Sequence, residues 1–444
     1  MSAIASFMAD RGHRVAGSDR SFDQNPDHPV YRALKARGIC IAPQDGSGID
    51  DSFDFTVFST AVEPSQPEFI KAKTLGIPLK TRPEYLAEIV KEFRTIAVAG
   101  TSGKSTSAGM LAFLMKTLGL RPNFIGGGRV KQCRSGRDAG NAMTGGSDWL
   151  VVEACESDGT IVHYRPFFSV ILNLELDHHP VEETGGMFRT LMKNTARNVI
   201  LNADDPHLGR FAEGEPVTFS LQVPSKYRAT DIALMPLESE FSVRGIRFRL
   251  CLPGRYNLSN ALSCIALLSE LDIPLGDIAG ALHQFTGIER RFDVVLDDGK
   301  RLVVDDYAHN PHKISSLLEA MKRIRERICY IFQPHGFGPT RMMKDAYITA
   351  FTEHLRDSDH LIVLPIFYAG GTASRDISAG DLAGGVRAAG RSAEAADNRE
   401  SILGRIREWD SYVVFGARDE TLSNLAREIA GTLSRGRGTG DERD

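Results

Sequence analysis

Long apolar runs are missing from this chain of 444 residues. No stretch approaches the roughly 18 consecutive apolar residues that a membrane-spanning helix needs, and no charged segment followed by an apolar stretch opens the sequence. Neither sign of charge is in large excess, because 53 Lys and Arg stand against 57 Asp and Glu, which gives a net charge of -4. We therefore expect a soluble, cytoplasmic protein with no membrane and no nucleic-acid partner.

Cysteine is equally sparse. The six cysteines are scattered and form no C-x-x-C pair, which argues against a zinc module or a disulfide framework. No short internal repeat is visible. The composition, 42% hydrophobic and 25% charged, is that of an ordinary soluble protein. Because the chain is too long for one compact core, two or three domains are expected.

The strongest positive signal is a glycine-rich loop that follows an apolar, β-branched run. Its residues are Gly100, Thr101, Ser102, Gly103, Lys104, Ser105 and Thr106. The glycines let backbone N–H groups turn toward phosphate oxygens, Lys104 supplies a point charge, and Ser105 offers a hydroxyl to Mg²⁺. The spacing is tighter than the general G-x-x-x-x-G-K-[ST] form. The loop predicts binding of a nucleoside triphosphate, with a Gly/Ser-rich surface turn as the alternative.

Apolar patterns divide the chain into three α/β units. The first alternates helical and strand patterns, with a helix over 2–10, and a linker carrying Pro83 follows over 81–91. The third repeats a doubly wound pattern. The expected boundaries are 1–90, 91–286 and 287–433 for the three domains and 434–444 for a disordered tail.

Carboxylates and histidines follow two strands of the central unit. Glu153 and Glu156 come after one strand, and an Asp-His-His run at 177–179 comes after another. Because the carboxyl ends of parallel strands meet at one edge of a sheet, these groups are suited to hold Mg²⁺ beside the phosphate loop. We predict Ser105, Glu153 and His178 as the metal ligands. A histidine pair serving only in hydrogen-bonded structure is the alternative, and zinc is a weaker one.

Two pairs of like residues stand near the end of the central unit. Asn257 and Asn260 lie three apart at the head of a long apolar helix and share one face of its first turn. Two amides there can read an adenine edge, and helix capping by Asn257 is the open alternative. Arg290 and Arg291 stand at a domain junction, where they can neutralise charge on a triphosphate as phosphoryl transfer proceeds.

Polar clusters also end two strands of the third unit. One holds Asp306 and His309, and the other is a Phe-Gln-Pro-His run that ends at His335. We expect both to line the face turned toward the nucleotide.

Taken in order, these motifs resemble the ATP-dependent Mur ligases of peptidoglycan synthesis, and the similarity covers nearly the whole chain. The Glu-Ala-x-Glu-Ser-Asp and Phe-Gln-Pro-His motifs are similar to the branch that contains UDP-N-acetylmuramate–L-alanine ligase and the murein tripeptide-recycling ligase. The matching stretches are 100–106, 153–158, 173–178, 202–205, 253–257 with Asn260, 285–291 and 305–311.

The resemblance implies a fold of three domains: a Rossmann-like domain for a UDP-sugar, a central P-loop ATPase-type α/β domain, and a Rossmann-like C-terminal domain. It implies an ADP-forming ligase in which a substrate carboxylate takes the γ-phosphate of ATP and an amine then displaces phosphate. The substrates would be a UDP-N-acetylmuramate-type sugar nucleotide and an amino acid, L-alanine by family default, or a short peptide.

The resemblance also assigns roles to particular residues. Lys104 would bind phosphate and Ser105 would bind Mg²⁺, and Glu153 and His178 would be further ligands of the metal. Arg290 or Arg291 would meet phosphate, and His335 would lie by the amino substrate. Asn257 and Asn260 would contact adenine, and Asp306 with His309 would face ribose or the incoming amine.

Two departures from the family pattern stand out. Met1 and Ser2 match the end of the glycine-rich loop that opens this branch, so we expect the natural start to lie upstream, the alternative being a lost sugar-nucleotide site. Gly336 and Pro339 replace two arginines that pair with the carboxylate of alanine in relatives. Arg341 alone stays in reach. A tripeptide-recycling ligase and a non-catalytic ATP-binding paralogue are therefore kept as alternatives.

Overall fold

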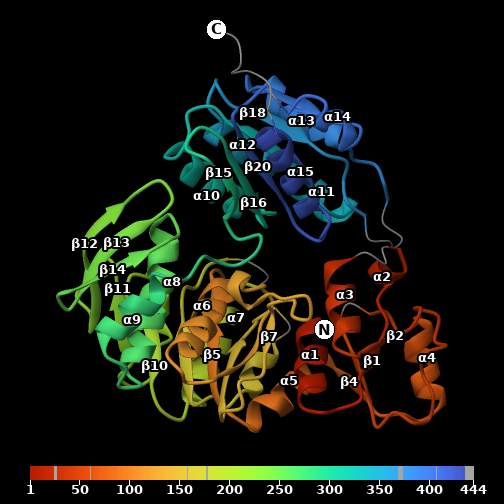
Figure 1. The fold of residues 1–444 in the computed structure, drawn as a ribbon, viewed down its shortest axis with the longest axis vertical. Helices are drawn as coiled ribbons and strands as arrows, with labels where there is room; N and C mark the ends of the chain where they lie inside the picture. The colour runs from red at the N-terminus through yellow and green to blue at the C-terminus, as the bar shows by residue number, and fades with distance from the viewer. Residues whose placement is uncertain are drawn as a thin grey trace. The chain divides into compact units, whose positions relative to one another are not determined.

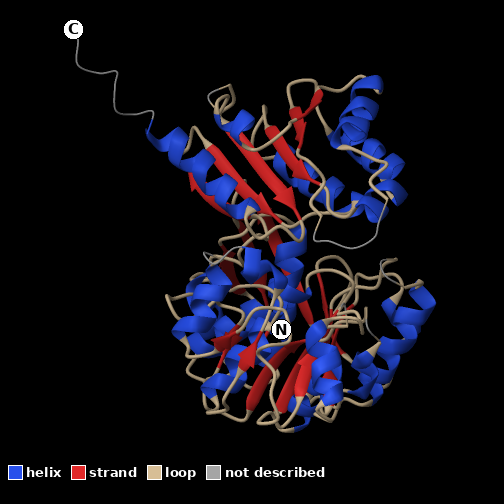
Figure 2. Ribbon diagram, turned by 90° about the vertical axis from the view of Figure 1, so that its right-hand side faces the viewer, coloured by secondary structure: helices blue, strands red, loops and turns tan. Residues whose placement is uncertain are grey.

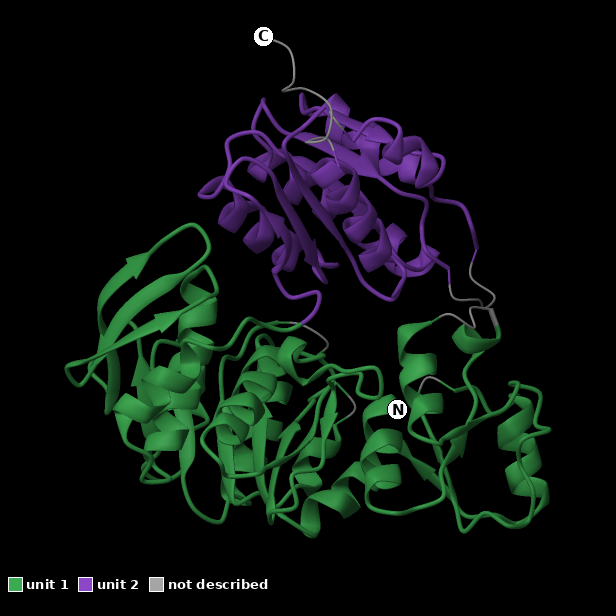
Figure 3. Cartoon of the chain, viewed as in Figure 1, with its two compact units in different colours: residues 1–288 green, residues 289–444 purple. Residues whose placement is uncertain are grey.

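The structure is a computed structural model that describes residues 1–24, 28–60, 62–157, 159–176, 179–368, 374–406 and 408–435. The chain divides into two compact units, residues 1–288 and 289–444 (Figure 3). Helices and strands are mixed in both units (Figure 2), so the predicted α/β class is confirmed. Within the described part of the chain, no helix combines the length and the apolar character that crossing a membrane requires.

The first part of unit 1 is a small α/β region. β1 pairs with β2 and β3 pairs with β4, each pair in parallel, which gives two separate two-stranded sheets. The predicted helix over 2–10 is α1. The elements are α1 (Ser2–Asp10), β1 (Ala16–Gly17), α2 (Arg20–Gln24), α3 (Pro29–Ala36), β2 (Cys40–Ile41), β3 (Thr56–Phe58), α4 (Pro67–Thr74), β4 (Leu79–Thr81) and α5 (Arg82–Lys91).

Helix α5 occupies the segment for which the sequence predicted a linker, so that prediction is wrong. The Glu84 carboxylate accepts the Thr81 N–H at 2.8 Å, and the Thr81 hydroxyl accepts the Glu84 N–H at 3.4 Å, which together form a capping box. Pro83 stands in the first turn, where a helix needs no N–H from it. Here proline begins a helix and does not break one.

A ten-stranded sheet dominates the rest of unit 1 (Figure 1). Its strands follow the order β14-β13-β12-β11-β10-β9-β5-β8-β6-β7. Its strands from β12 to β6 in this order run parallel. The ten strands of the sheet are β5 (Arg94–Ala99), β6 (Asn123–Ile125), β7 (Ala142–Met143), β8 (Trp149–Glu153), β9 (Phe168–Ile171), β10 (Val199–Asn202), β11 (Val217–Ser220), β12 (Tyr227–Leu234), β13 (Ser239–Val243) and β14 (Ile246–Leu250).

Strand β5 lies between β8 and β9, and this position decides where the site forms. Its last five residues are buried, as expected for an apolar β-branched strand covered on both faces. The loop after β5 therefore has the ends of β8 and β9 on either side. The helices of this region are α6 (Lys104–Thr117), α7 (Val181–Lys193), α8 (Arg255–Ser269) and α9 (Leu275–Leu282).

Unit 2 is a six-stranded sheet in the order β15-β16-β20-β17-β18-β19, in which the β15–β16 pair is antiparallel and the other pairs are parallel. Its strands are β15 (Asp293–Asp297), β16 (Leu302–Asp306), β17 (Cys329–Gln333), β18 (His360–Val363), β19 (Ala393–Ala395) and β20 (Ser411–Gly416). The helices of unit 2 are α10 (Pro311–Lys322), α11 (Phe337–Met342), α12 (Lys344–His354), α13 (Ala379–Ala388), α14 (Glu400–Leu403) and α15 (Leu422–Arg435).

Neighbouring residues of β20 serve opposite faces of this sheet. Val414 packs in one apolar cluster with Leu425 and Ile429 of α15, while the Phe415 ring lies 6.3 Å from that of Phe351 on α12. The sheet is thus covered by helices on both sides, as the doubly wound pattern predicted. Helix α15 extends to Arg435, two residues into the predicted tail, and residues 436–444 lie outside the described part.

Candidate functional site

The glycine-rich loop joins β5 to α6, as the sequence predicts. Gly100 has φ 143° and Gly103 has φ 84°, conformations that residues with a Cβ rarely adopt. Gly103 is the N-cap of α6 and offers no side chain to its first turn. The helix therefore presents the backbone N–H groups and the positive end of its dipole that favour a bound phosphate.

Asn173, which the sequence analysis did not single out, fixes the shape of this loop from the end of β9. Its Oδ1 accepts the Thr101 hydroxyl and the Ser102 N–H, both at 2.8 Å. Its Nδ2 donates to the Ser102 carbonyl at 3.1 Å. One amide thus holds two consecutive loop residues. Its signals in the sequence were its position just after an apolar strand and its place at the start of the matching stretch 173–178.

The two asparagines of α8 have different surroundings. A Cβ placed on Gly103 would lie 2.5 Å from the Asn260 Oδ1, so Asn260 touches the phosphate loop itself. Asn257 donates from Nδ2 to the Pro253 carbonyl at 2.8 Å. Because the N-cap of α8 is Gly254, which has no side-chain cap, helix capping by Asn257 does not occur. Contact of either amide with adenine stays a prediction.

Ser105 and Glu153 lie together, as predicted for a metal site. The Ser105 hydroxyl donates to Glu153 Oε2 at 3.0 Å, and the Gly127 N–H donates to Oε1 at 2.6 Å. The third predicted ligand, His178, lies outside the described residues. Among the residues that the structure does describe, no group of three or more His, Cys, Asp and Glu side chains could hold a metal ion.

Lys104 forms an ion pair with Glu156, a carboxylate for which a different role was predicted. Its Nζ lies 2.9 Å and 2.8 Å from the two carboxylate oxygens of Glu156 and 2.6 Å from the Gly100 carbonyl. Glu156 was grouped with the metal-binding carboxylates because it follows β8. The structure pairs it with the lysine of the phosphate loop.

In unit 2, the ends of β16, β17 and β20 bring His309 and His335 together, with their ring centroids 5.5 Å apart. His309 donates from Nδ1 to the Tyr307 carbonyl at 2.8 Å, which leaves Nε2 as the unprotonated ring nitrogen of the neutral imidazole. Burial lowers the pKa of His309 to about 4, and burial together with Arg418 lowers the pKa of His335. Both rings are therefore neutral at pH 7.

The low pKa of His309 makes the stability of unit 2 depend on pH. The unfolded chain takes up a proton at this ring near pH 6.5, while the folded chain does so only near pH 4. The free energy of unfolding is thus expected to fall by up to about 3 kcal/mol as the pH drops through this window. Urea unfolding of a Trp149→Phe background, followed by the fluorescence of Trp409, would measure it. His309→Gln should flatten the profile, and parallel profiles would contradict the assignment.

Asp306 accepts main-chain N–H groups with both carboxylate oxygens, from Phe292 at 2.6 Å and from Ala308 at 2.7 Å. Burial raises its pKa. The side chain ties the start of unit 2 to the end of β16. Its predicted contact with ribose would have to be made beside these two bonds.

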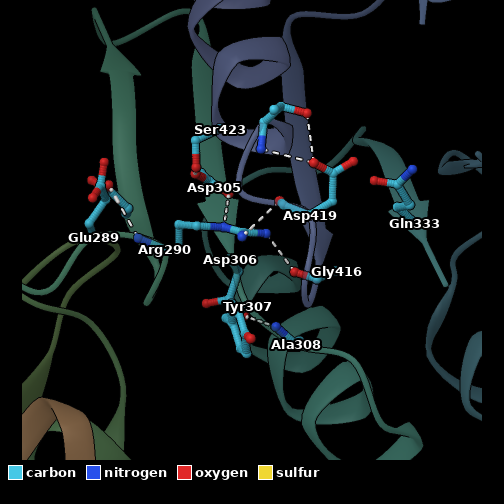
Figure 4. A network of polar contacts seen from close by, with 12 residues as sticks. Glu289, Arg290, Asp305, Asp306, Tyr307, Ala308, Gln333, Gly416, Asp419 and Ser423 are labelled. Atoms are coloured by element: carbon cyan, nitrogen blue, oxygen red, sulfur yellow. Dashed lines mark hydrogen bonds and ion pairs between the residues drawn. The ribbon is translucent and has the colours of Figure 1, made fainter. Parts of the chain in front are cut away.

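The paired arginines differ sharply in their exposure. Arg290 is only 2% exposed, donates to the carbonyls of Gly416 at 2.6 Å and Asp419 at 3.0 Å, and places Nε 3.5 Å from Asp305 Oδ1 (Figure 4). Arg291 is partly exposed, and its guanidinium lies 4.8 Å from the Tyr307 ring centre. Of the two arginines predicted to contact phosphate, only Arg291 has a guanidinium group that is accessible from solvent.

The segment after His335 is held against the loop that follows β18. Gly336 donates its N–H to the Phe367 carbonyl at 2.8 Å. Arg341 forms an ion pair with Asp376 and donates to the Ser374 carbonyl at 3.0 Å. The one arginine that was expected to stay in reach of a donor carboxylate already has an acidic partner.

A strand, a glycine-rich loop, a lysine at a helix start and a nearby carboxylate define a P-loop nucleotide-binding enzyme, and comparisons with known proteins identify its family. Mur ligase family models match three consecutive regions: the catalytic domain over residues 1–94, the middle domain over 98–268 and the glutamate ligase domain over 290–418. The chain belongs to the Mur ligase family, whose members are ATP-dependent ligases, so the predicted family, fold and enzyme class are confirmed.

Relatives cover nearly the whole chain. The UDP-N-acetylmuramate–L-alanine ligase of Syntrophotalea carbinolica is 32% identical over 92% of this chain and 90% of its own. That of Xanthomonas oryzae pv. oryzae is 31% identical over 94% and 91%. The crystal structure of UDP-N-acetylmuramate-alanine ligase MurC from Thermotoga maritima matches with a TM-score of 0.82 at 25% identity, covering 98% and 97%. A murein peptide ligase from Psychrobacter arcticus shares the fold, with a TM-score of 0.69 at 21% identity over 98% and 96%.

Proposed function

We propose that this protein is an ADP-forming ligase that joins an amino acid to the lactyl carboxylate of UDP-N-acetylmuramate through an acyl phosphate, in the cytoplasm. The observation that carries the proposal is the loop at the head of α6, where Lys104 stands next to Ser105 and the Ser105 hydroxyl donates to Glu153 at 3.0 Å. The names of the relatives supply the substrates. In this scheme residues 1–90 bind the sugar nucleotide, 91–286 bind ATP and 287–433 bring the amine.

The chemistry explains why these residue types are needed. A carboxylate is a poor electrophile at neutral pH, and it must approach an anionic triphosphate before it can react. Lys104 offsets that repulsion at the phosphate oxygens, and the first-turn N–H groups of α6 add to its effect. Holding both anions in one place removes the entropic cost of their encounter. The unprotonated Nε2 of His309 can then accept a hydrogen bond from the incoming amine.

Mg²⁺ fits the donor set that the structure describes. Ser105 would supply a hydroxyl and Glu153 a carboxylate, which is the small number of protein ligands that Mg²⁺ takes beside phosphates. When bound, the ion would neutralise charge between neighbouring phosphate groups.

The identity of the amine donor is a second question, and one observation favours a donor other than free L-alanine. Gly336 and Pro339 carry no charge, and Arg341 is paired with Asp376. A donor carboxylate would have to compete with Asp376 for that guanidinium. A peptide donor whose carboxylate lies farther from its amine does not depend on this contact.

One assay tests both parts of the proposal. ADP release and the mass of the product are measured with ATP and UDP-N-acetylmuramate against L-alanine, glycine, L-serine and the murein tripeptide. We expect ADP and amide to form in equal amounts, and only when sugar nucleotide and donor are both present. ADP that forms without any amide would contradict the ligase assignment, and a protein that forms neither product would favour a non-catalytic ATP-binding paralogue.

A further inference from the structure

The lysine of the phosphate loop is fully engaged in this structure. Its Nζ contacts both carboxylate oxygens of Glu156, at 2.9 Å and 2.8 Å, and the Gly100 carbonyl at 2.6 Å. The Glu156 side chain is 2% exposed and that of Lys104 is 14% exposed. This is a largely buried ion pair in which the carboxylate has given up nearly all its contact with water.

An ammonium group has three N–H bonds and no more. Here each of the three has an acceptor, so a phosphate oxygen can bind Lys104 only by displacing one of them. The Gly100 carbonyl belongs to the loop itself. The acceptor that can be given up is therefore a carboxylate oxygen of Glu156.

We propose that Glu156 is a positioning residue that holds Lys104 in the nucleotide-free loop and yields it to the phosphates when ATP binds. This inference rests on the proposed binding of ATP at the loop. The Glu156 carboxylate compensates the charge of a largely buried cation. Once ATP is bound, Glu156 and the phosphates compete for the same ammonium, and their like charges repel each other across a poorly hydrated space. Glu156 thus weakens nucleotide binding and speeds the release of ADP.

Glu153, three residues away, does not share this role. Its oxygens accept the Ser105 hydroxyl and the Gly127 N–H. Two carboxylates that follow one strand therefore have different partners. Glu153 accepts the Ser105 hydroxyl at the predicted metal site, and Glu156 pairs with Lys104.

The test is the substitution Glu156→Gln in the full chain, with nucleotide affinity measured by calorimetric titration with ADP and with a non-hydrolysable ATP analogue. The amide keeps the size of the side chain but removes the charge that competes with phosphate. We expect the dissociation constants to fall about tenfold. In turnover, the KM for ATP and kcat should both fall, because ADP leaves more slowly. A purely structural role would raise KM instead.

Glu88→Gln is the matched control. Glu88 forms a 2.6 Å ion pair with Lys80 in the first part of unit 1, so this change also removes one carboxylate from a lysine. Nucleotide affinity should not change in this variant. Glu156→Asp keeps the charge but reaches less far, and its affinity should lie between those of the wild type and Glu156→Gln. If Glu156→Gln does not fold, the Asp variant decides.

An affinity in Glu156→Gln that equals or falls below that of the wild type overturns the inference. So does an Asp variant that binds nucleotide no more tightly than the wild type. A wild-type chain that binds neither nucleotide would overturn the proposed function as well, and the two failures are therefore distinguishable.

Discussion

Replacing Lys104 by alanine is expected to lower the rate of ADP formation about a hundred- to a thousandfold, with substrates saturating. Lys104 is the cation at the head of α6 that would meet the charge developing on the phosphates, and removing one such group from a catalytic site commonly has an effect of this size. Coupled-enzyme measurement of ADP release in the presence of sugar nucleotide and donor gives the rate.

Lys116 provides the control for this prediction. It stands in the last turn of the same helix and is exposed. Lys116→Ala also removes a lysine side chain from α6. It should leave the rate within about twofold of the wild type, because Lys116 is far along the helix from the loop. A Lys104→Ala protein that kept a tenth or more of the wild-type rate would show that phosphoryl transfer does not use this loop.

The second large effect separates the paired arginines. Arg290→Ala is expected to lower the free energy of unfolding of unit 2 by about 3 kcal/mol or more, because it leaves the buried carboxylate of Asp305 without its cation. Burial already raises the pKa of Asp305 to about 7. Arg291→Ala removes a partly exposed side chain and should cost less than about 1 kcal/mol, yet it should lower kcat.

The fluorescence of Trp409 in a Trp149→Phe background reports the unfolding of unit 2 in both variants, because the chain has only two tryptophans. The double variant Arg290→Ala with Asp305→Asn should recover part of the lost stability, since the unpaired carboxylate is gone. Equal destabilisation by Arg290→Ala and Arg291→Ala, or no recovery in the double variant, would refute the distinction between the two residues.

Local signals in the sequence were sufficient for the phosphate loop. The apolar strand and the glycine-rich loop after it depend on neighbouring residues, and both were predicted. The structure adds the positive φ of Gly100 and Gly103 and the start of α6 at Lys104. The segment 81–91 shows the limit of such reasoning. Pro83 was taken as a sign of a linker, although the Thr81–Glu84 capping box makes the same proline part of a helix start.

Pairings between distant residues could not be predicted. Lys104 and Glu156 are 52 positions apart, and only the adjacency of β5 and β8 brings them together. Likewise, nothing in the sequence indicated which of Arg290 and Arg291 is buried and which is exposed. They are consecutive, so the direction of each side chain depends on the backbone, and Arg290 has φ 58°. That conformation accompanies a side chain directed into the core of unit 2.

Transfer of the γ-phosphate of ATP to the carboxylate of the sugar nucleotide, before the amine attacks, is the step on which the proposed ligase function depends. It is tested most directly by preparing UDP-N-acetylmuramate with ¹⁸O in its lactyl carboxylate and following the label by mass spectrometry during turnover. An acyl phosphate intermediate predicts one ¹⁸O atom in each inorganic phosphate released, with the amide product retaining the other. Phosphate that carries no label while amide is formed would contradict the account.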